Sequence, residues 1–151
     1  MLRSIRLQNF KSFADAQVTL GPLTVLVGAN GAGKSNVLDA LRFLKGVALT
    51  DLPLDRILQG QAGHRGGWPG IRGGVHEVVR AGADAFGLET VWDAPVRFGS
   101  LAYELGCAVV PFPHVRSESL RATTSSDVVF EASTSLEEVL ARDEGASINW
   151  L

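Results

Sequence analysis

The sequence predicts an α/β fold in which a buried strand, a glycine-rich turn and an amphipathic helix follow one another. Three observations predict it. The run "LTVLV" (23–27) is apolar and β-branched, "GANGAGKSN" (28–36) supplies three glycines directly after it, and apolar residues then recur at helical spacing. Later segments alternate apolar and polar residues between Pro, Gly and Ser, which is typical of an antiparallel β-meander.

The first two elements are predicted to be an antiparallel strand pair. "SIRLQNF" (4–10) alternates with period two, "AQVTL" (16–20) forms a second strand, and "SFAD" supplies the turn between them. "LTVLV" has the composition of a strand that is buried on both faces.

A helix is predicted from Lys34 onward, and Gly46 is expected to end it. Its apolar positions are Val37, Leu38, Leu41 and Leu44, with Asp39, Arg42 and Lys45 pointing outward. A second short helix is expected within 47–58, and irregular structure in 60–74, which holds seven of the 17 glycines. The remaining expected elements are strands over 87–93, 100–110, 114–122 and 126–133, and a short helix over 135–145.

Composition limits the class of protein. The length of 151 residues suits one domain, and the net charge of −2 argues against indiscriminate binding to nucleic acid by the whole chain. The sequence shows neither a membrane-spanning apolar run nor a signal peptide, so we expect a cytoplasmic protein with no membrane partner. Cys107 is the single cysteine, which excludes an intrachain disulfide, and we interpret it as a small core residue.

The segment from Gly28 to Ser35 matches the phosphate-binding P-loop pattern G-x-x-x-x-G-K-[ST]. Glycines let consecutive backbone N–H groups turn inward around phosphate oxygens, and the following helix adds its unpaired N–H groups and positive dipole end. Lys34 is expected to neutralise phosphate charge, and Ser35 to give its hydroxyl to Mg²⁺ as the metal ligand. The alternative is a strand-to-helix turn without a ligand, but the predicted strand before the motif and helix after it favour a nucleotide.

Residues 2–44, "LRSIRLQNFKSFADAQVTLGPLTVLVGANGAGKSNVLDALRFL", resemble the N-terminal end of the RecF/SMC/Rad50-like ATPases. These belong to the ATP-binding-cassette (ABC) class, together with the OLD-type and AAA-labelled predicted ATPases. The resemblance rests on "NFKSF", on "LTVLVGANGAGKSN" and on "LDALRFL". It implies a P-loop NTPase whose first, ABC-ATPase-like lobe carries an antiparallel β-subdomain.

The resemblance also implies the ligands, ATP and Mg²⁺, and adds residues to the expected site. Lys11 and Ser12 would lie near the nucleotide, and Asn30 near the γ-phosphate or the attacking water. Lys11 is otherwise a solvated lysine at a strand end, and Asn30 a turn residue that tolerates positive φ. The full set of expected nucleotide-binding residues is Gly28, Ala29, Asn30, Gly31, Ala32, Gly33, Lys34, Ser35, Asn36, Lys11 and Ser12.

Other parts of the family's machinery are not recognisable in the sequence. Hydrolysis in the family needs four apolar residues followed by Asp and Glu, and the chain ends at "SINWL" before any such motif or an "LSGG"-like signature. Glu131 follows only a short apolar run, and Gln59 and Gln61 are candidate γ-phosphate sensors by residue type alone. We therefore expect residues 1–151 to be a single, incomplete ATPase domain that binds ATP better than it cleaves it, with no assigned catalytic residue.

Three functions stay open. The first is the ATP-binding lobe of a RecF/SMC-like ATPase in DNA repair or in defence against foreign DNA, with a C-terminal half or second ATPase head, and DNA, as partners. The second is a non-hydrolysing nucleotide-binding module that needs a second chain, and the third is a P-loop kinase. The loop at 60–74, with His64, Arg65 and Arg72, is either a basic contact loop or a surface insertion, and Trp68 either stacks on a base or covers a core edge.

Overall fold

The structure is a computed structural model that describes residues 1–60, 67–94, 99–123 and 128–133. Their elements are, in chain order, β1 (Leu2–Phe10), β2 (Phe13–Thr19), α1 (Lys34–Leu49), α2 (Leu54–Gln59), α3 (Gly74–Val78), β3 (Ala85–Asp93), β4 (Ser100–Ala108), β5 (His114–Ala122) and β6 (Val128–Ser133).

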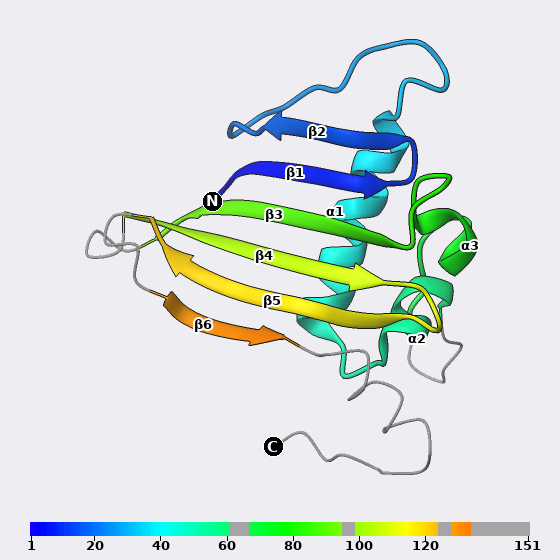
Figure 1. Cartoon of the computed structure of the whole chain (residues 1–151). Coiled ribbons are helices and arrows are strands. Elements are labelled where there is room, and N and C mark those ends of the chain that lie inside the picture. The colour runs from blue at the N-terminus through cyan, green and yellow to red at the C-terminus, as the bar shows by residue number, and fades with distance from the viewer. Residues whose placement is uncertain (61–66, 95–98, 124–127, 134–151) are drawn as a thin grey trace.

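The strands form one antiparallel sheet in the order β2-β1-β3-β4-β5-β6 (Figure 1). β3 to β6 follow one another as the predicted meander. The predicted strand pair, β1 and β2, joins this meander because β1 pairs with β3, with Leu7 opposite Leu88. The α/β fold class is confirmed, and the two β regions share one sheet.

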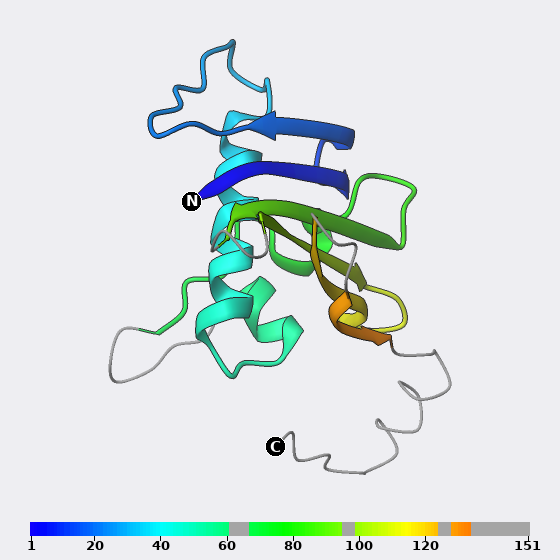
Figure 2. The ribbon, with the colours of Figure 1, turned by 90° about the vertical axis from the view of Figure 1, so that its left-hand side faces the viewer.

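The helices pack on one face of this sheet, with α1 crossing the strands (Figure 2). Alternate residues of each strand point toward the helices, as the period-two pattern requires. Phe43 of α1 meets Phe86 of β3 with ring centroids 5.4 Å apart, and both rings are buried. Cys107 is fully buried in the same core, so its predicted place is confirmed.

The segment 23–27 differs from its prediction. It is not a strand, and Leu23, Val25 and Val27 are 85%, 72% and 84% exposed. It belongs to the part of the chain that projects beyond β2 at the top of Figure 1. A strand requires a neighbour for its N–H and C=O groups, and among the described residues none pairs with this segment. The segment thus has the composition that is typical of a buried strand, but it forms no strand, and most of its apolar side chains are exposed.

Gly46 does not end α1, which continues to Leu49. It is buried inside the helix, where an added Cβ would lie 2.7 Å from Trp68 Cζ2 and 2.8 Å from Ile57 Cγ2. The glycine gives room for these two side chains to approach the helix. Trp68 therefore covers a core edge, and its indole Nε1–H donates to the Ile57 carbonyl at 2.7 Å.

The other predicted boundaries shift by a few residues. The turn between β1 and β2 occupies residues 11–12 and is tighter than "SFAD" predicts, because Phe13 already pairs with Phe10. The predicted helix within 47–58 corresponds to the end of α1 and to α2. Residues 67–73 are free of helix and extended strand as expected, but Gly74 begins α3. The predicted helix over 135–145 lies outside the described residues. No helix in the described ranges is long and apolar enough to cross a membrane.

Candidate nucleotide-binding site

The glycine-rich loop approaches α1 through glycines with backbone angles that other residues rarely adopt. Gly31 has φ +85° and Gly33 has φ +89°, and the Ala32 N–H donates to the Ala29 carbonyl at 3.2 Å. Such left-handed positions strongly favour glycine, since a Cβ would crowd the backbone there. The motif's second and third glycines therefore produce the curl that turns this segment into the helix.

The N-terminus of α1 is free to receive an anion. The helix begins at Lys34, its N-cap is Gly33, no side chain caps it, and its first turn holds no acidic residue. The first N–H groups of a helix have no carbonyl partner inside the helix, and they carry the positive end of the helix dipole. A carboxylate at this end would compete with an incoming phosphate, so its absence suits an anionic ligand.

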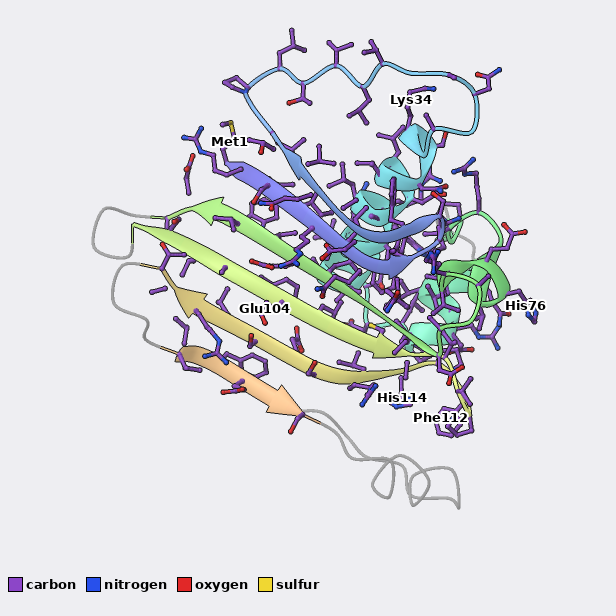
Figure 3. All side chains as sticks on the ribbon, turned by 45° about the horizontal axis from the view of Figure 1, so that its top comes forward. Met1, Lys34, His76, Glu104, Phe112 and His114 are labelled. Atoms are coloured by element: carbon purple, nitrogen blue, oxygen red, sulfur yellow. The ribbon has the colours of Figure 1, made fainter. Side chains whose placement is uncertain are left out.

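Lys34 lies at this end of the helix, beside the loop (Figure 3). Its ammonium donates to the carbonyls of Gly28 and Ala29, both at 2.6 Å. The positive charge is thus held against the first two residues of the motif. A third ammonium hydrogen remains for a phosphate oxygen, because an ammonium group has three donors.

Ser35 and Asn36 follow Lys34 in the first turn. Ser35 is exposed, so its hydroxyl is available to a metal ion. Asn36 is held on both sides of its amide: its Nδ2 donates to Ser12 Oγ at 2.8 Å, and its Oδ1 accepts from Arg72 at 3.3 Å. The predicted residues Ser12 and Asn36 are therefore adjacent. Asn30 lies in the turn, but it is not among the described non-glycine residues with positive φ, which are Asn9 and Lys11.

Asp39 is the part of the site that the sequence interpretation missed. The helical pattern predicts Asp39 on the outer face of the helix, but the residue is 1% exposed, whereas the predicted core residue Leu38 is 57% exposed. Asp39 points inward because its carboxylate contacts positively charged side chains from two other segments of the chain. Its Oδ2 lies 3.1 Å from Lys11 Nζ and 2.7 Å from an Arg72 nitrogen, and its Oδ1 lies 3.5 Å from Arg42.

These contacts decide the ionisation of Asp39. Burial alone would raise the pKa of this carboxyl, but hydrogen bonds from Arg72 and Lys11 and their positive charges outweigh burial, so its pKa lies below the usual value. Asp39 in turn raises the pKa of Arg72, mainly through the hydrogen bond between them. The cluster is therefore charged at neutral pH.

Lys11 is not the solvated lysine that one sequence interpretation allowed. Its side chain is 7% exposed, and besides Asp39 its ammonium contacts the Arg72 carbonyl at 2.6 Å. Arg72 itself is 56% exposed and stands in the glycine-rich segment 60–74. One arginine of that segment thus faces α1. A lone aspartate at a helix position next to an apolar residue was the only sequence signal for this cluster.

The remaining candidates do not join the site. Glu131 lies on β6, where it pairs with Arg121 at 3.2 Å, and β6 is the sheet edge opposite β2. Gln59 ends α2 and is exposed. Gln61, His64 and Arg65 lie outside the described residues. No cluster of three or more His, Cys, Asp or Glu side chains that could hold a metal occurs in the ranges that the structure describes. The role of Ser35 as a metal ligand stays a prediction of the motif.

Several known proteins are similar to this chain. It is 57% identical over 47 residues to the chromosome partition protein Smc of Desulfitobacterium hafniense, which covers 30% of this chain and 4% of that one. It is 41% identical over 59 residues to the OLD nuclease of Thermus scotoductus, covering 39% and 11% of the two chains. It is 35% identical over 114 residues to the DNA replication and repair protein RecF of Caulobacter vibrioides, covering 71% and 25%.

A solved structure of the recombination mediator protein RecF with ATP also matches, at 18% identity and a TM-score of 0.48, over 85% of this chain and 27% of that one. The chain thus spans a quarter or less of the length of the three relatives above. The model of the AAA ATPase domain family matches residues 1–90, more than half of the chain. This match and the relatives confirm the resemblance of residues 2–44, and the chain belongs to the AAA ATPase domain family, with Smc, OLD nuclease and RecF among its relatives.

Proposed function

We propose that this chain binds Mg-ATP through its P-loop and is the N-terminal nucleotide-binding lobe of a RecF/SMC-like ATPase. The observation that carries the proposal is the loop itself. Gly31 and Gly33 lead with positive φ into an uncapped helix N-terminus, and Lys34 stands beside it. This arrangement supplies backbone donors, a helix dipole and the Lys34 ammonium as a cation for a polyphosphate.

Each group of the site has a role in the proposal. The backbone N–H groups of residues 29–35 hold phosphate oxygens, Lys34 neutralises their charge, and Ser35 gives its hydroxyl to Mg²⁺. Bound Mg²⁺ would offset the negative charge of the phosphate groups. The choice of adenine follows only from the family. The direct contact of Lys11 and Ser12 with the nucleotide stays a prediction.

We further propose that residues 1–151 are one incomplete ATPase domain. The support is the segment 23–27, in which Leu23, Val25 and Val27 are exposed and the backbone pairs with no strand among the described residues. Strands from a C-terminal half or from a second chain would cover it, and the catalytic carboxylates would come from there. The names of the relatives, which include repair, chromosome partition and nuclease functions, support a role on DNA, such as DNA repair. A role in defence against foreign DNA follows only from the family resemblance.

Calorimetric titration with ATP, with and without Mg²⁺, tests the proposal. We expect Mg²⁺-dependent binding that Lys34→Ala weakens roughly 10- to 150-fold, as the loss of one charged hydrogen-bonding group does. Lys45→Ala is a matched control, because Lys45 is an exposed lysine farther along the same helix. Binding that Lys34→Ala leaves unchanged would refute the assignment of the P-loop.

A phosphate-release assay on the same samples separates the alternatives. We expect no turnover by this chain alone, and turnover after the addition of a chain that carries the missing carboxylates. A module that only binds nucleotide would stay inactive with every such chain. A kinase would instead transfer phosphate to a small acceptor, which a screen of acceptors would detect.

A further inference from the structure

The face of the sheet that points away from the helices carries two opposed glutamates. Glu89 of β3 and Glu104, at the middle of β4, are directly opposite each other in the strand register (Figure 3). Leu88 and Thr90, which flank Glu89 in the chain, are buried and pair with core residues of β1, so both glutamates stand on the open face. Like charges directly opposite each other on neighbouring strands are destabilising. This pair therefore lowers the stability of the free chain.

The cations nearest to these glutamates have other partners. Arg6 donates to Asp15 at 2.8 and 2.6 Å and lies 3.9 Å from Glu89. Arg121 is paired with a carboxylate of β6 at 3.2 Å. Among the described residues, Glu104 forms no ion pair, and Glu89 forms only the long one to Arg6. The centre of the open face therefore has an excess of negative charge.

Two glycines beside the glutamates leave the sheet without side chains. Gly87 and Gly106 are directly opposite each other, each two positions from one of the glutamates. All four residues line one groove of about 340 Å³. Along the strands the glycines and the glutamates are about 7 Å apart, a distance that the stem of an arginine side chain spans. The groove thus has room for such a stem over the glycines, and two carboxylates at its end.

A hydroxyl group stands next to the two carboxylates. Ser119 of β5 is directly opposite Glu104 and is 6% exposed. Its hydroxyl has no hydrogen-bond partner among the described residues. The oxygen still reaches the surface, because no fully buried polar side-chain atom in these residues lacks a partner. It is therefore available to a donor that approaches Glu104.

The groove extends farther than a single small cation needs. Beyond Gly87 and Gly106 it continues into a hollow of about 620 Å³, whose lining includes Gln8, Arg116 and Ser117. These side chains offer amide, guanidinium and hydroxyl groups, which suit the carbonyl and N–H groups of a polypeptide backbone. The described residues contain no cluster of three His, Cys, Asp or Glu side chains here that could hold a metal ion. The shape and the charge together favour a polypeptide that carries a cation.

We propose that the open face of the sheet is a docking surface for a partner segment that carries an arginine. The stem of this arginine lies over Gly87 and Gly106, and its guanidinium is held between Glu89 and Glu104. Arginine suits the place better than lysine, because its planar group has five donors and reaches two carboxylates and the Ser119 hydroxyl at once. The inference does not depend on the nucleotide site, since α1 lies on the other face of the sheet (Figure 2).

Amide NMR of the full chain tests the docking. The probe is the blocked peptide Ala-Ala-Arg-Ala-Ala, and the same peptide with Gln in place of Arg is the neutral control. We expect the arginine peptide, and not the control, to shift the amide signals of residues 87–89 and 104–106. Equal shifts by both peptides, or shifts elsewhere only, would overturn the proposal. Shifts of the same amides by Ca²⁺ at a lower concentration than the peptide would identify a metal site and would also overturn it.

Two variants separate a specific groove from general attraction to an acidic protein. Glu104→Gln should weaken peptide binding about fivefold, as the loss of one exposed ion pair does at most. Glu77→Gln is the matched control, because it removes the same charge from an exposed position on α3, on the helix side. Equal weakening by both would show that only the net charge matters, and would refute the groove.

Gly87→Val fills the groove without a change of charge. It should fold, because β-branched residues suit strands and the nearest atom to an added Cβ is Gln8 Oε1, at 3.1 Å and at the end of a flexible side chain. We expect it to weaken peptide binding, whereas parent-like binding would show that the peptide lies elsewhere.

A measurement on the free chain tests the premise. Glu104→Gln should melt at a higher temperature than the parent, because it removes the opposed charge, and added salt should reduce the difference by screening. No rise in melting temperature would show that the two glutamates do not repel each other, and the argument for a missing cation would fail. ATP affinity should be the same in parent and Glu104→Gln, so a failure of this proposal leaves the proposed function untouched.

Discussion

Replacement of Asp39 by asparagine tests whether the buried ionic cluster stabilises the fold around the P-loop. The side chains of Asp39 and Lys11 are 2% and 7% exposed, so removal of the carboxylate charge leaves a buried ammonium without its counter-ion. Breaking one partner of a buried pair costs about 3–5 kcal/mol. We take the lower end, about 3 kcal/mol, because the other two partners of Asp39 are partly exposed and water can solvate them.

A second aspartate–arginine pair provides the control. Arg6 and Asp15 form two hydrogen bonds of 2.8 and 2.6 Å, distances close to the 2.9 and 2.7 Å between Arg72 and Asp39, but their side chains are 42% and 50% exposed. Exposed ion pairs contribute little, since water already solvates both charges. Asp15→Asn should therefore change stability far less than Asp39→Asn, although the two pairs look alike.

Urea unfolding followed by circular dichroism measures both effects. For a chain of this size, a loss of about 3 kcal/mol corresponds to a fall in melting temperature of roughly 6 to 12 °C. The double variant Asp39→Asn with Lys11→Met should recover part of the loss, because it removes the unpaired buried cation. Equal effects of Asp39→Asn and Asp15→Asn would refute the reasoning from burial.

The same pair predicts a pH dependence. The pKa of Asp39 is lower in the folded chain than its ordinary value, so the folded state binds fewer protons there than the unfolded state does. The contribution of Asp39 is thus fully present above the unfolded pKa, about 4, and is lost as the pH falls through the folded pKa. The stability difference between parent and Asp39→Asn should therefore shrink below about pH 4, and a difference that grows there would contradict the assignment.

Two further predictions concern the core. Gly46→Ala should destabilise the chain by about 1 kcal/mol. Alanine favours the helix by about 1 kcal/mol relative to glycine, but overlap of its methyl group with Trp68 and Ile57 costs about 1–3 kcal/mol. A stabilised variant in urea unfolding would show that these neighbours can move. Cys107 should resist thiol reagents in the folded chain, because burial and, to a smaller extent, the charge of Glu118 raise the pKa of its thiol. Labelling in urea gives the reference rate, and rapid labelling under native conditions would contradict this burial.

The P-loop could be predicted from the sequence because its information is local. Its glycines, Lys34 and Ser35 lie within eight consecutive positions, and the backbone angles they require follow from residue type. The ionic cluster could not be predicted in this way. Arg72 and Asp39 are 33 positions apart, and no helical periodicity states that a carboxylate will turn inward to meet a distant guanidinium. Sequence periodicity alone therefore placed Asp39 outside and Leu38 inside.

The segment 23–27 shows a different limit of sequence interpretation. Its apolar pattern correctly describes a segment suited to burial, but the pattern does not say which segment will cover it. β1 pairs with β2 on one side and with β3 of the meander on the other, so both strands have antiparallel neighbours within the described residues. The strand before a P-loop needs neighbours on both sides, and the described part of this chain supplies neither.

These two limits together indicate how the site should respond to a partner whose strand pairs with residues 23–27. The turn at Lys11–Phe13 contacts the exit of the P-loop, at Gly33 and the first turns of α1, whereas the entry at Gly28 follows a segment with no sheet neighbour. Fixing the backbone of one residue costs about 1–2 kcal/mol, so a nucleotide that must order the entry alone binds more weakly than one that finds it already ordered. A partner strand against 23–27 would meet this cost in advance. We therefore expect a partner strand that covers 23–27 to raise ATP affinity by fixing the entry of the loop, apart from any contact that the partner's carboxylates make with the nucleotide.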